Sequence, residues 1–298
     1  MNILNNQEGG AYSMNHNWKD VLPIDSIQEI IPVSGGDVNQ AFRVETNSKP
    51  YFLLVQTGRS ADFYTGEIAG LEEMAKAGIT VPQVIDSGEN QGDAYLLLSY
   101  LEEGQNGNQR ELGRMVAQLH QYHSDGGLYG FDAPYEGADI QFDNSWTDSW
   151  LELFVERRMD KLHRLLVDNN KWNQRQSDTY QQVRQIMVDE LTRHKSDPSL
   201  LHGDLWAGNY MFLSDGSPAL FDPASMYGDR EFDLGATKVF GGFNSDFYAA
   251  YDEAYPLSEG SELRIEFYRL YLLMVHLHKF GATYESSVNQ SISIILNA

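Results

Sequence analysis

The 298-residue chain has no cysteine, few basic residues and no long apolar run. Without cysteine it can form neither a disulfide nor a thiol nucleophile. Its 21 lysine and arginine residues face 43 aspartate and glutamate residues, giving a net charge of −22. A surface for nucleic acid or an anionic membrane is therefore not expected, because both need clustered basic residues. No apolar run approaches the length that spans a bilayer, and residues 1–17 lack the pattern of a signal peptide, so we expect a cytoplasmic protein.

The most informative segment that is present begins with LHGDLWAGN and continues through an apolar run, PALFDPA. It contains His202, Asp204 and Asn209 in the H-x-D-x-x-x-x-N order, followed by Asp222 at the end of the apolar run. In protein-kinase-like enzymes this loop supplies an acid that accepts the proton of the substrate hydroxyl and an asparagine that holds magnesium. A second aspartate, just after a short strand, completes the metal coordination. The segment predicts Asp204 as the catalytic residue of a phosphoryl transfer, with Asn209 and Asp222 as magnesium ligands.

The context of these residues strengthens the prediction. An aspartate and an asparagine at this spacing also occur by chance, and Gly-Asp alone is an ordinary turn signal. Here Leu200 and Leu201 lead into the loop, and the run after Asn209 reads as a strand, a Ser-Asp-Gly turn at 214–216, and a second strand that delivers Asp222. We call residues 202–209 the catalytic loop.

The first third of the chain predicts a small antiparallel sheet. At this length two lobes are expected, and residues 1–17, rich in Asn, Gln and Gly, are predicted to be disordered. From Trp18, short apolar runs alternate with turns that contain Gly or Pro, which is typical of hairpin strands. We predict an N-terminal, nucleotide-binding lobe over residues 18–101 with strands Ile27–Val33, Ala41–Thr46, Tyr51–Gln56, Val81–Ser87 and Ala94–Tyr100 and one helix, Ser60–Ala77.

Residues 102–298 have helical patterning and are predicted to form a larger lobe that carries the catalytic loop and binds substrate. Residues 128–144 are rich in Gly, Asp and aromatic residues and are expected to be a loop. The predicted helices are Arg110–Tyr122, Trp146–Asp168, Ser177–His194, Asp246–Tyr255, Ser261–Phe280 and Ser286–Leu296. The fold class that follows is α+β and bilobal.

From about Trp18 onward the chain resembles the fructosamine kinase (ketosamine-3-kinase) family, a branch of the aminoglycoside phosphotransferase and choline kinase-like group with a protein-kinase-like fold. The resemblance rests on these blocks: LHGDLWAGN, FDPASMYGDREFDL, FGGF, FYAAYDEAYPL, SGGDVNQAFRV, YGF at 129–131, WTDSWLELFVERRM and residues 270–281. Trp206 and the DPASMYGDRE run favour this branch over its antibiotic-modifying relatives.

The resemblance implies a kinase that uses ATP and Mg²⁺ to phosphorylate the sugar 3-hydroxyl of small-molecule or protein-bound ketosamines, in the repair of glycation. Gly35 and Gly36 would let backbone amides approach the phosphates. Glu67 matches the acid that pairs with a strand lysine, and residues 99–101, Ser99, Tyr100 and Leu101, would form the hinge that reads adenine. The oligomeric state is not predicted.

One departure from the family pattern affects the nucleotide site. Leu54 stands where the family carries its ATP-contacting lysine, so Glu67 would lose its partner. A charge-assisted hydrogen bond is worth about 1.5–3 kcal/mol, so its loss corresponds to a fall of one to two orders of magnitude in how well the protein binds and uses ATP. Arg43 on the neighbouring strand could replace the cation, with Lys49 and Arg59 as flanking alternatives.

Three functional alternatives follow. The first is an active ketosamine kinase, which retention of Asp204, Asn209 and Asp222 favours. The second is a catalytically weak protein with a kinase fold that binds a nucleotide or a glycated amine. The third, within the kinase class, is a phosphotransferase for an aminoglycoside or a choline-like substrate.

Substrate contacts are predicted for three further residues. The ring of Trp206 could stack on the sugar or the amine substituent, although a core position is also compatible with the sequence. Asp229 or Glu231 could meet the substrate amine, since both follow Tyr227 in an acidic cluster.

Other candidates are expected to be structural. His202 should hold the catalytic loop by packing and hydrogen bonding, and Asp233 should fix the same loop through backbone hydrogen bonds. His276 and His278 have no partner at metal-ligand spacing.

Overall fold

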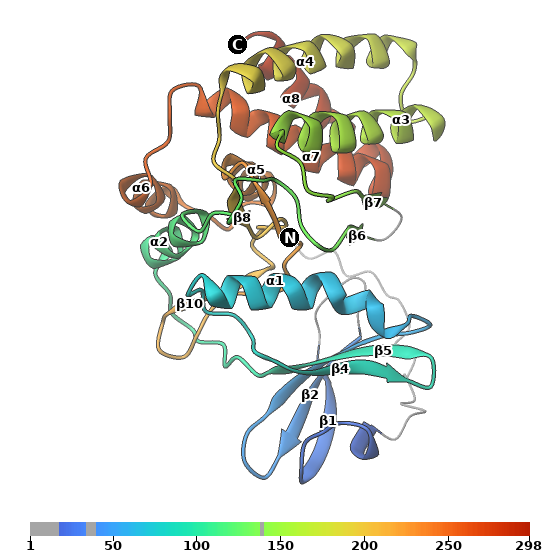
Figure 1. Ribbon diagram of the computed structural model, residues 1–298, viewed down its shortest axis with the longest axis vertical. Coiled ribbons are helices and arrows are strands. Elements are labelled where there is room, and N and C mark those ends of the chain that lie inside the picture. Colours follow the sequence, from blue (N-terminus) through green and yellow to red (C-terminus); the bar gives the residue numbers. More distant parts are fainter. Residues whose placement is uncertain (1–17, 34–39, 138–139) are drawn as a thin grey trace. The chain divides into compact units, whose positions relative to one another are not determined.

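A computed structural model describes residues 18–33, 40–137 and 140–298 (Figure 1). The predicted disordered segment, 1–17, and the predicted phosphate-contacting residues Gly35 and Gly36 lie outside these ranges. The chain forms two compact units, described separately below. The first contains the described residues up to Phe63 together with Ile85–Ser99, and the second contains the described residues of Tyr64–Val84 and Tyr100–Ala298.

The first unit is built on a five-stranded sheet with the order β1-β2-β3-β5-β4 (Figure 1). The strands are β1 (Ile27–Val33), β2 (Gln40–Thr46), β3 (Tyr51–Gln56), β4 (Val84–Asn90) and β5 (Asp93–Ser99). Phe42, Val44, Leu53 and Leu97 form a core on one face of this sheet. Four of the strands match their predicted ranges closely. The predicted Val81–Ser87 strand instead begins at Val84, because Pro82 has no N–H to donate to a neighbouring strand.

The second unit is mainly helical, and together with the sheet of the first unit it confirms the α+β prediction. Its helices are α1 (Thr65–Lys76), α2 (Gln109–His120), α3 (Asp160–Asp168), α4 (Gln174–Arg193), α5 (Glu231–Phe240), α6 (Ser245–Ala254), α7 (Ser261–Phe280) and α8 (Glu285–Leu296). Helices α3, α4, α7 and α8 lie together, and α2 lies beside α6 (Figure 1). Gly113 allows this last approach, since an added Cβ there would lie 2.3 Å from the carbonyl oxygen of Phe247.

Three short strand pairs complete the second unit. They are β6 (Tyr135–Gly137) with β7 (Ile140–Phe142), β8 (Ser199–Leu201) with β11 (Met226–Gly228), and β9 (Tyr210–Phe212) with β10 (Pro218–Leu220). The β6–β7 pair lies within the segment predicted to be a loop.

Helix boundaries follow local signals in the sequence. Helix α7 spans its predicted range and ends at Phe280, and the next residue, Gly281, has a φ of +75° that suits glycine. Helix α4 starts three residues earlier than predicted, because Asn173 and Gln176 form a capping box. The predicted helix 146–168 begins later and has π-helical geometry over Glu152–Met159 before α3. No helix among the described residues is both long and apolar enough to cross a membrane.

Helix α1 groups with the second unit, although the sequence placed it in the lobe of residues 18–101. Met74 and the following Ile79 are buried in the large core of the second unit. Gly70 packs so closely that an added Cβ would lie 2.8 Å from Ser225 Oγ and 3.1 Å from Pro223 Cγ. The packing of α1, rather than its place in the chain, therefore decides that it belongs to the second unit.

Candidate active site

The catalytic loop joins β8 to β9, and the segment 221–225 joins β10 to β11. The Ala224 N–H donates to the His202 carbonyl at 2.9 Å, and the Phe221 N–H donates to the Asn209 carbonyl at 3.1 Å. The amide nitrogen of Asn209 donates to the Asp204 backbone oxygen at 2.8 Å and to its Oδ2 at 3.2 Å. The strand, turn and strand predicted between Asn209 and Asp222 are therefore present, and they bring the two loops together.

Backbone geometry makes this contact close. Gly203 has a φ of +84°, and an added Cβ would lie 1.9 Å from the Ala224 carbonyl oxygen. Only glycine fits there without moving one loop away from the other. Asp222 also has a positive φ, +54°, a conformation that is uncommon outside glycine and that aspartate tolerates better than most residues.

Asp233, at the start of α5, anchors the catalytic loop as predicted. Its carboxylate is fully buried and accepts the N–H groups of His202 at 2.7 Å and Gly203 at 2.9 Å. His120 Nε2 lies 3.1 Å from the same carboxylate, and its Nδ1 lies 2.8 Å from Tyr251 Oη. A charged acceptor shared by successive backbone donors fixes the path of the loop at Asp204.

His202 supports the loop from inside, which confirms its predicted structural role. Its Nδ1 accepts the Asp204 N–H at 3.2 Å, so Nε2 is the donor to the Phe221 carbonyl at 3.0 Å. Burial lowers the pKa of His202, which favours this neutral form.

The negative charge of Asp222 acts on the partly buried carboxylates of Asp204 and Glu67. Burial, followed by the charge of Asp222, raises the pKa of Asp204 to about 7 and that of Glu67 to about 8. Burial also raises the pKa of Asp222. Within the described residues, none of the three forms an ion pair with lysine or arginine. These hard oxygen donors fit Mg²⁺, whose charge would offset the repulsion.

In the first unit, β-sheet register defines the surroundings of Leu54. Leu54 pairs with Ala41 on β2 and with Leu96 on β5, and Arg43 pairs with Phe52. Because directly paired residues share a face, Arg43 lies on the same face of the sheet as Leu54. Its Nε forms an ion pair with Glu45 at 2.5 Å.

The predicted hinge follows this sheet. Ser99 is the last residue of β5 and pairs with Tyr51, and Tyr100 and Leu101 continue the chain into the second unit. Their contact with adenine remains a prediction.

The predicted substrate contacts of Asp229 and Glu231 need correction. Both are 1% exposed, and both are held by neighbouring side chains. Arg264 donates to the two oxygens of Glu231 at 2.8 Å each, and Tyr268 donates to Asp229 at 2.8 Å. Neither carboxylate can therefore reach a substrate amine.

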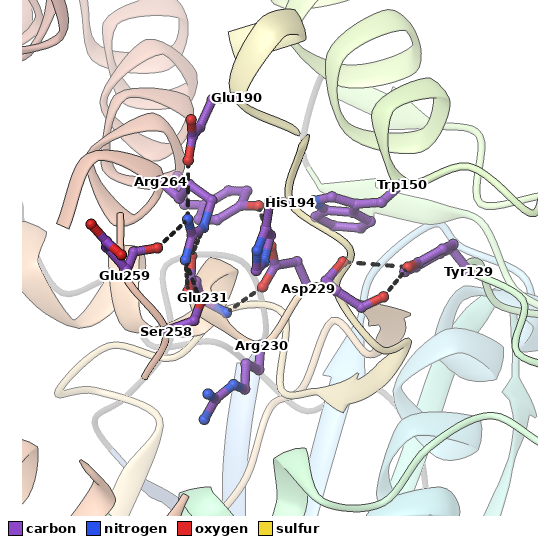
Figure 2. Close-up of polar contacts among 12 residues, drawn as sticks. Tyr129, Trp150, Glu190, His194, Asp229, Arg230, Glu231, Ser258, Glu259 and Arg264 are labelled. Carbon is purple, nitrogen blue, oxygen red and sulfur yellow. Dashed lines mark hydrogen bonds and ion pairs between the residues drawn. The ribbon is translucent and has the colours of Figure 1, made fainter. Parts of the chain in front are cut away.

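These two acids belong to a buried polar network with His194 (Figure 2). His194 Nε2 lies 3.3 Å from Asp229 Oδ2, and Glu190 adds a second carboxylate to Arg264 at 3.1 Å. Ligand atoms of His194, Asp229 and Glu231 lie within 4.8 Å of one another, as a metal site would need. The guanidinium of Arg264 already offsets the charge of Glu231, so the network needs no metal.

Trp206 lies at the surface of the second unit, not in its core. Its side chain is 39% exposed, and its ring meets Phe240 edge-on at 5.9 Å between centroids. Gly208 makes room for the ring, because an added Cβ there would lie 2.2 Å from it. The exposed ring therefore remains available for the predicted stacking.

Sequence reasoning missed the end of α7 as part of this region. Leu272 and Val275 line a cavity of about 20 Å³ with Gly203 and Asp204. His276, which the sequence suggested was only structural, packs against Phe240 at 4.8 Å. Leu272 and His276 lie four residues apart and so share one face of α7, but nothing in the sequence indicates that this face meets the catalytic loop.

Comparisons with known proteins agree with this geometry. The sequence profile described as fructosamine kinase matches residues 12–298. A protein of Staphylococcus aureus assigned as a ketoamine kinase is 58% identical over 283 residues, covering 95% of this chain and 98% of its own length.

Solved structures extend the comparison. A protein of Haemophilus somnus assigned as a fructosamine-3-kinase has a TM-score of 0.79 and 29% identity, covering 91% of this chain and 92% of that one. A thermostable mutant of an aminoglycoside phosphotransferase, in ternary complex with AMP-PNP and hygromycin B, shares the fold with a TM-score of 0.63 and 13% identity. That match covers 91% of this chain and 94% of the phosphotransferase.

Proposed function

Because this chain belongs to the fructosamine kinase family, we propose that it transfers the γ-phosphoryl group of ATP to the 3-hydroxyl of a fructosamine or related ketosamine. Family membership confirms the resemblance found in the sequence, and it makes the chain a phosphotransferase that acts on a sugar hydroxyl. The observation that carries the proposal is the position of Asp204, which is held by Asn209 and by the loop anchored on Asp233.

Asp204 acts on the substrate hydroxyl. Its carboxylate orients the O–H group and accepts the proton as the oxygen bonds to the γ-phosphorus and the bond to the β-phosphate oxygen breaks. The products are the sugar phosphate and ADP, and the proton passes from Asp204 to solvent. The protein mainly positions the reactants, because phosphoryl transfer passes through a loose transition state with little covalent chemistry for side chains to perform.

Asn209 and Asp222 would hold Mg²⁺, which neutralises charge on the transferring phosphates. Asn209 uses its amide nitrogen to bind Asp204, so its carbonyl oxygen is the atom suited to the metal. Asp222 contributes a carboxylate whose neighbours are also acidic. Glu67 adds a third acidic group, and a divalent cation would favour its charged form in place of the absent strand lysine.

Leu54 supports a second candidate function, that of a weakly catalytic kinase-fold protein that binds a nucleotide or a glycated amine. Leucine cannot donate to a phosphate, and Arg43, the predicted substitute on the neighbouring strand, forms an ion pair with Glu45. The complete set of Asp204, Asn209 and Asp222 favours the enzyme, because simple binding needs no proton acceptor at the hydroxyl.

The proposed biological role is deglycation. Phosphorylation of the 3-hydroxyl would mark the sugar–amine adduct for spontaneous release of the amine. The role therefore requires phosphate at oxygen 3 and not at another hydroxyl.

The test is to incubate the protein with ATP, Mg²⁺ and N-(1-deoxyfructosyl)glycine and to locate the phosphate by its phosphorus–proton coupling in NMR spectra. We expect coupling to the proton on carbon 3, product formation at least about 100-fold slower with Asp204→Asn, and normal product with Asp215→Asn. Asp215 is an exposed acid in the β9–β10 turn and serves as the matched control. Phosphate on another hydroxyl would refute the 3-kinase assignment, and absence of product from the wild-type protein would favour the binding protein.

A further inference from the structure

Next to the catalytic loop, the second unit presents a connected group of aromatic side chains. The ring of Trp206 meets Phe240 at 5.9 Å, and Phe240 meets His276 at 4.8 Å. His276 then meets Phe280 at 5.5 Å and Tyr284 at 5.1 Å. We call these five side chains the aromatic shelf.

The shelf is exposed where most large apolar side chains are buried. Trp206 is 39% exposed, Phe240 40% and Phe280 57%. Exposed apolar side chains that occur singly are ordinary, but a contiguous exposed group marks a binding surface. The group starts two residues from Asp204, so a ligand on it lies beside the reacting sugar.

Lys279 adds a positive charge to this surface. It follows His276 by three residues and precedes Phe280, so the three side chains share one face of α7. The same stripe of α7 includes Leu272 and Val275, which line the small cavity with Asp204.

The charge of Lys279 is available to a ligand. Among the described residues, Lys279 forms no ion pair and donates no hydrogen bond. Its positive charge also acts on Asp204, since it opposes the rise that burial causes in the pKa of that carboxyl. An ammonium group without a carboxylate partner of its own suits an anionic substituent of the substrate.

We propose that the aromatic shelf and Lys279 bind the amine substituent of the substrate, and that the preferred substrates are ketosamines of free α-amino acids with large apolar side chains. The inference rests on the proposed function. In such a compound the α-carboxylate and the side chain leave the same carbon, which carries the amine. The side chain covers the shelf while the carboxylate pairs with Lys279. A glycated lysine within a protein has neither group near its amine.

The carboxylate contact is tested with two substrates that differ in that group alone. N-(1-deoxyfructosyl)-L-phenylalanine carries the carboxylate, and 1-deoxyfructosyl-2-phenylethylamine lacks it. We expect kcat/KM to favour the first about tenfold or more, as a charge-assisted contact would give. In Lys279→Gln the ratio should fall to about one, because any effect of the lost charge on Asp204 is shared by both substrates, whereas Lys195→Gln, an exposed lysine after α4, should keep the wild-type ratio.

The shelf contact is tested with Phe280→Ala. At 57% exposure Phe280 contributes little to the core, so this variant should fold normally. We expect the preference for the phenylalanine adduct over the glycine adduct to fall about fivefold or more, as the loss of apolar contact area predicts.

The outcomes separate the two proposals. If no ketosamine is phosphorylated, the proposed function fails and this inference fails with it. If the acid and amine substrates react equally well in the wild-type protein, the inference fails while the proposed function stands. If Lys279→Gln raises KM for ATP and lowers kcat/KM equally for both substrates, Lys279 serves the nucleotide and the inference is overturned.

Discussion

Replacing Asp233 by asparagine tests how the catalytic loop is held. The substitution keeps the size of the side chain and removes one acceptor oxygen together with the charge. In the wild-type protein Oδ1 accepts the Gly203 N–H, and Oδ2 accepts the His202 N–H and lies near His120. Asparagine offers one carbonyl oxygen and one amide nitrogen, so in either rotamer at least one of the two backbone N–H groups faces a donor.

The expected cost follows from these contacts. A buried donor left without an acceptor costs about 1–3 kcal/mol, and the remaining hydrogen bond loses its charge assistance. We therefore expect Asp233→Asn to lower the free energy of unfolding by about 2–4 kcal/mol. The loop would also lose its fixed position, and a displacement of about 1 Å at Asp204 can reduce turnover on the order of 100-fold.

Urea unfolding and kcat measured on the same preparation would provide the assay. Asp168→Asn is the control, because Asp168 is exposed at the end of α3 and a surface change of this kind alters stability by less than about 0.5 kcal/mol. The reasoning is refuted if Asp233→Asn unfolds at the wild-type urea concentration and keeps the wild-type kcat.

Three other predictions concern different parts of the chain. Arg264→Met should lower the free energy of unfolding by about 3–5 kcal/mol, because it leaves Glu231 buried without its partner. Adding Glu231→Gln should recover part of the lost stability, measured by thermal unfolding. An unchanged melting temperature for Arg264→Met would contradict this prediction. Burial lowers the pKa of His163 in the folded state, so its contribution is present above the unfolded pKa of about 6.5 and lost as the pH falls below it. His163→Gln should therefore lose less stability than wild type between pH 7 and 5. An equal loss in both proteins, measured by urea unfolding at each pH, would rule this out. Leu54→Lys should raise turnover at low ATP concentration by roughly 10- to 100-fold. If turnover is unchanged and Arg43→Ala abolishes activity, Arg43 instead supplies the positive charge that contacts ATP.

The sequence was sufficient to predict features encoded by short-range patterns. Apolar alternation and turn residues predicted the strands, and the order of Asp204, Asn209 and Asp222 within loop, strand, turn and strand predicted the hairpin that separates the catalytic loop from Asp222. The anchoring roles of His202 and Asp233 were also predictable, because a loop of this type needs acceptors for its backbone N–H groups.

Features set by tertiary packing were not predictable. Residues 231–237 of α5 are buried on all sides, so this helix shows no amphipathic period. For the same reason Glu231 looked accessible in the sequence, whereas Arg264, far along the chain, encloses it. The sequence also contains no sign that Lys279 shares a surface with Trp206. The two positions are linked by tertiary contacts, because Trp206 meets Phe240 of α5 and Phe240 meets His276 of α7.

The most direct test of the central claim is a single-turnover measurement of phosphoryl transfer with wild-type protein and Asp204→Asn, each saturated with ATP, Mg²⁺ and a ketosamine. If Asp204 accepts the proton of the sugar hydroxyl, the rate constant should fall by about 10²- to 10⁴-fold, while the Kd for ATP stays within about twofold. A rate constant within tenfold of wild type would contradict the account.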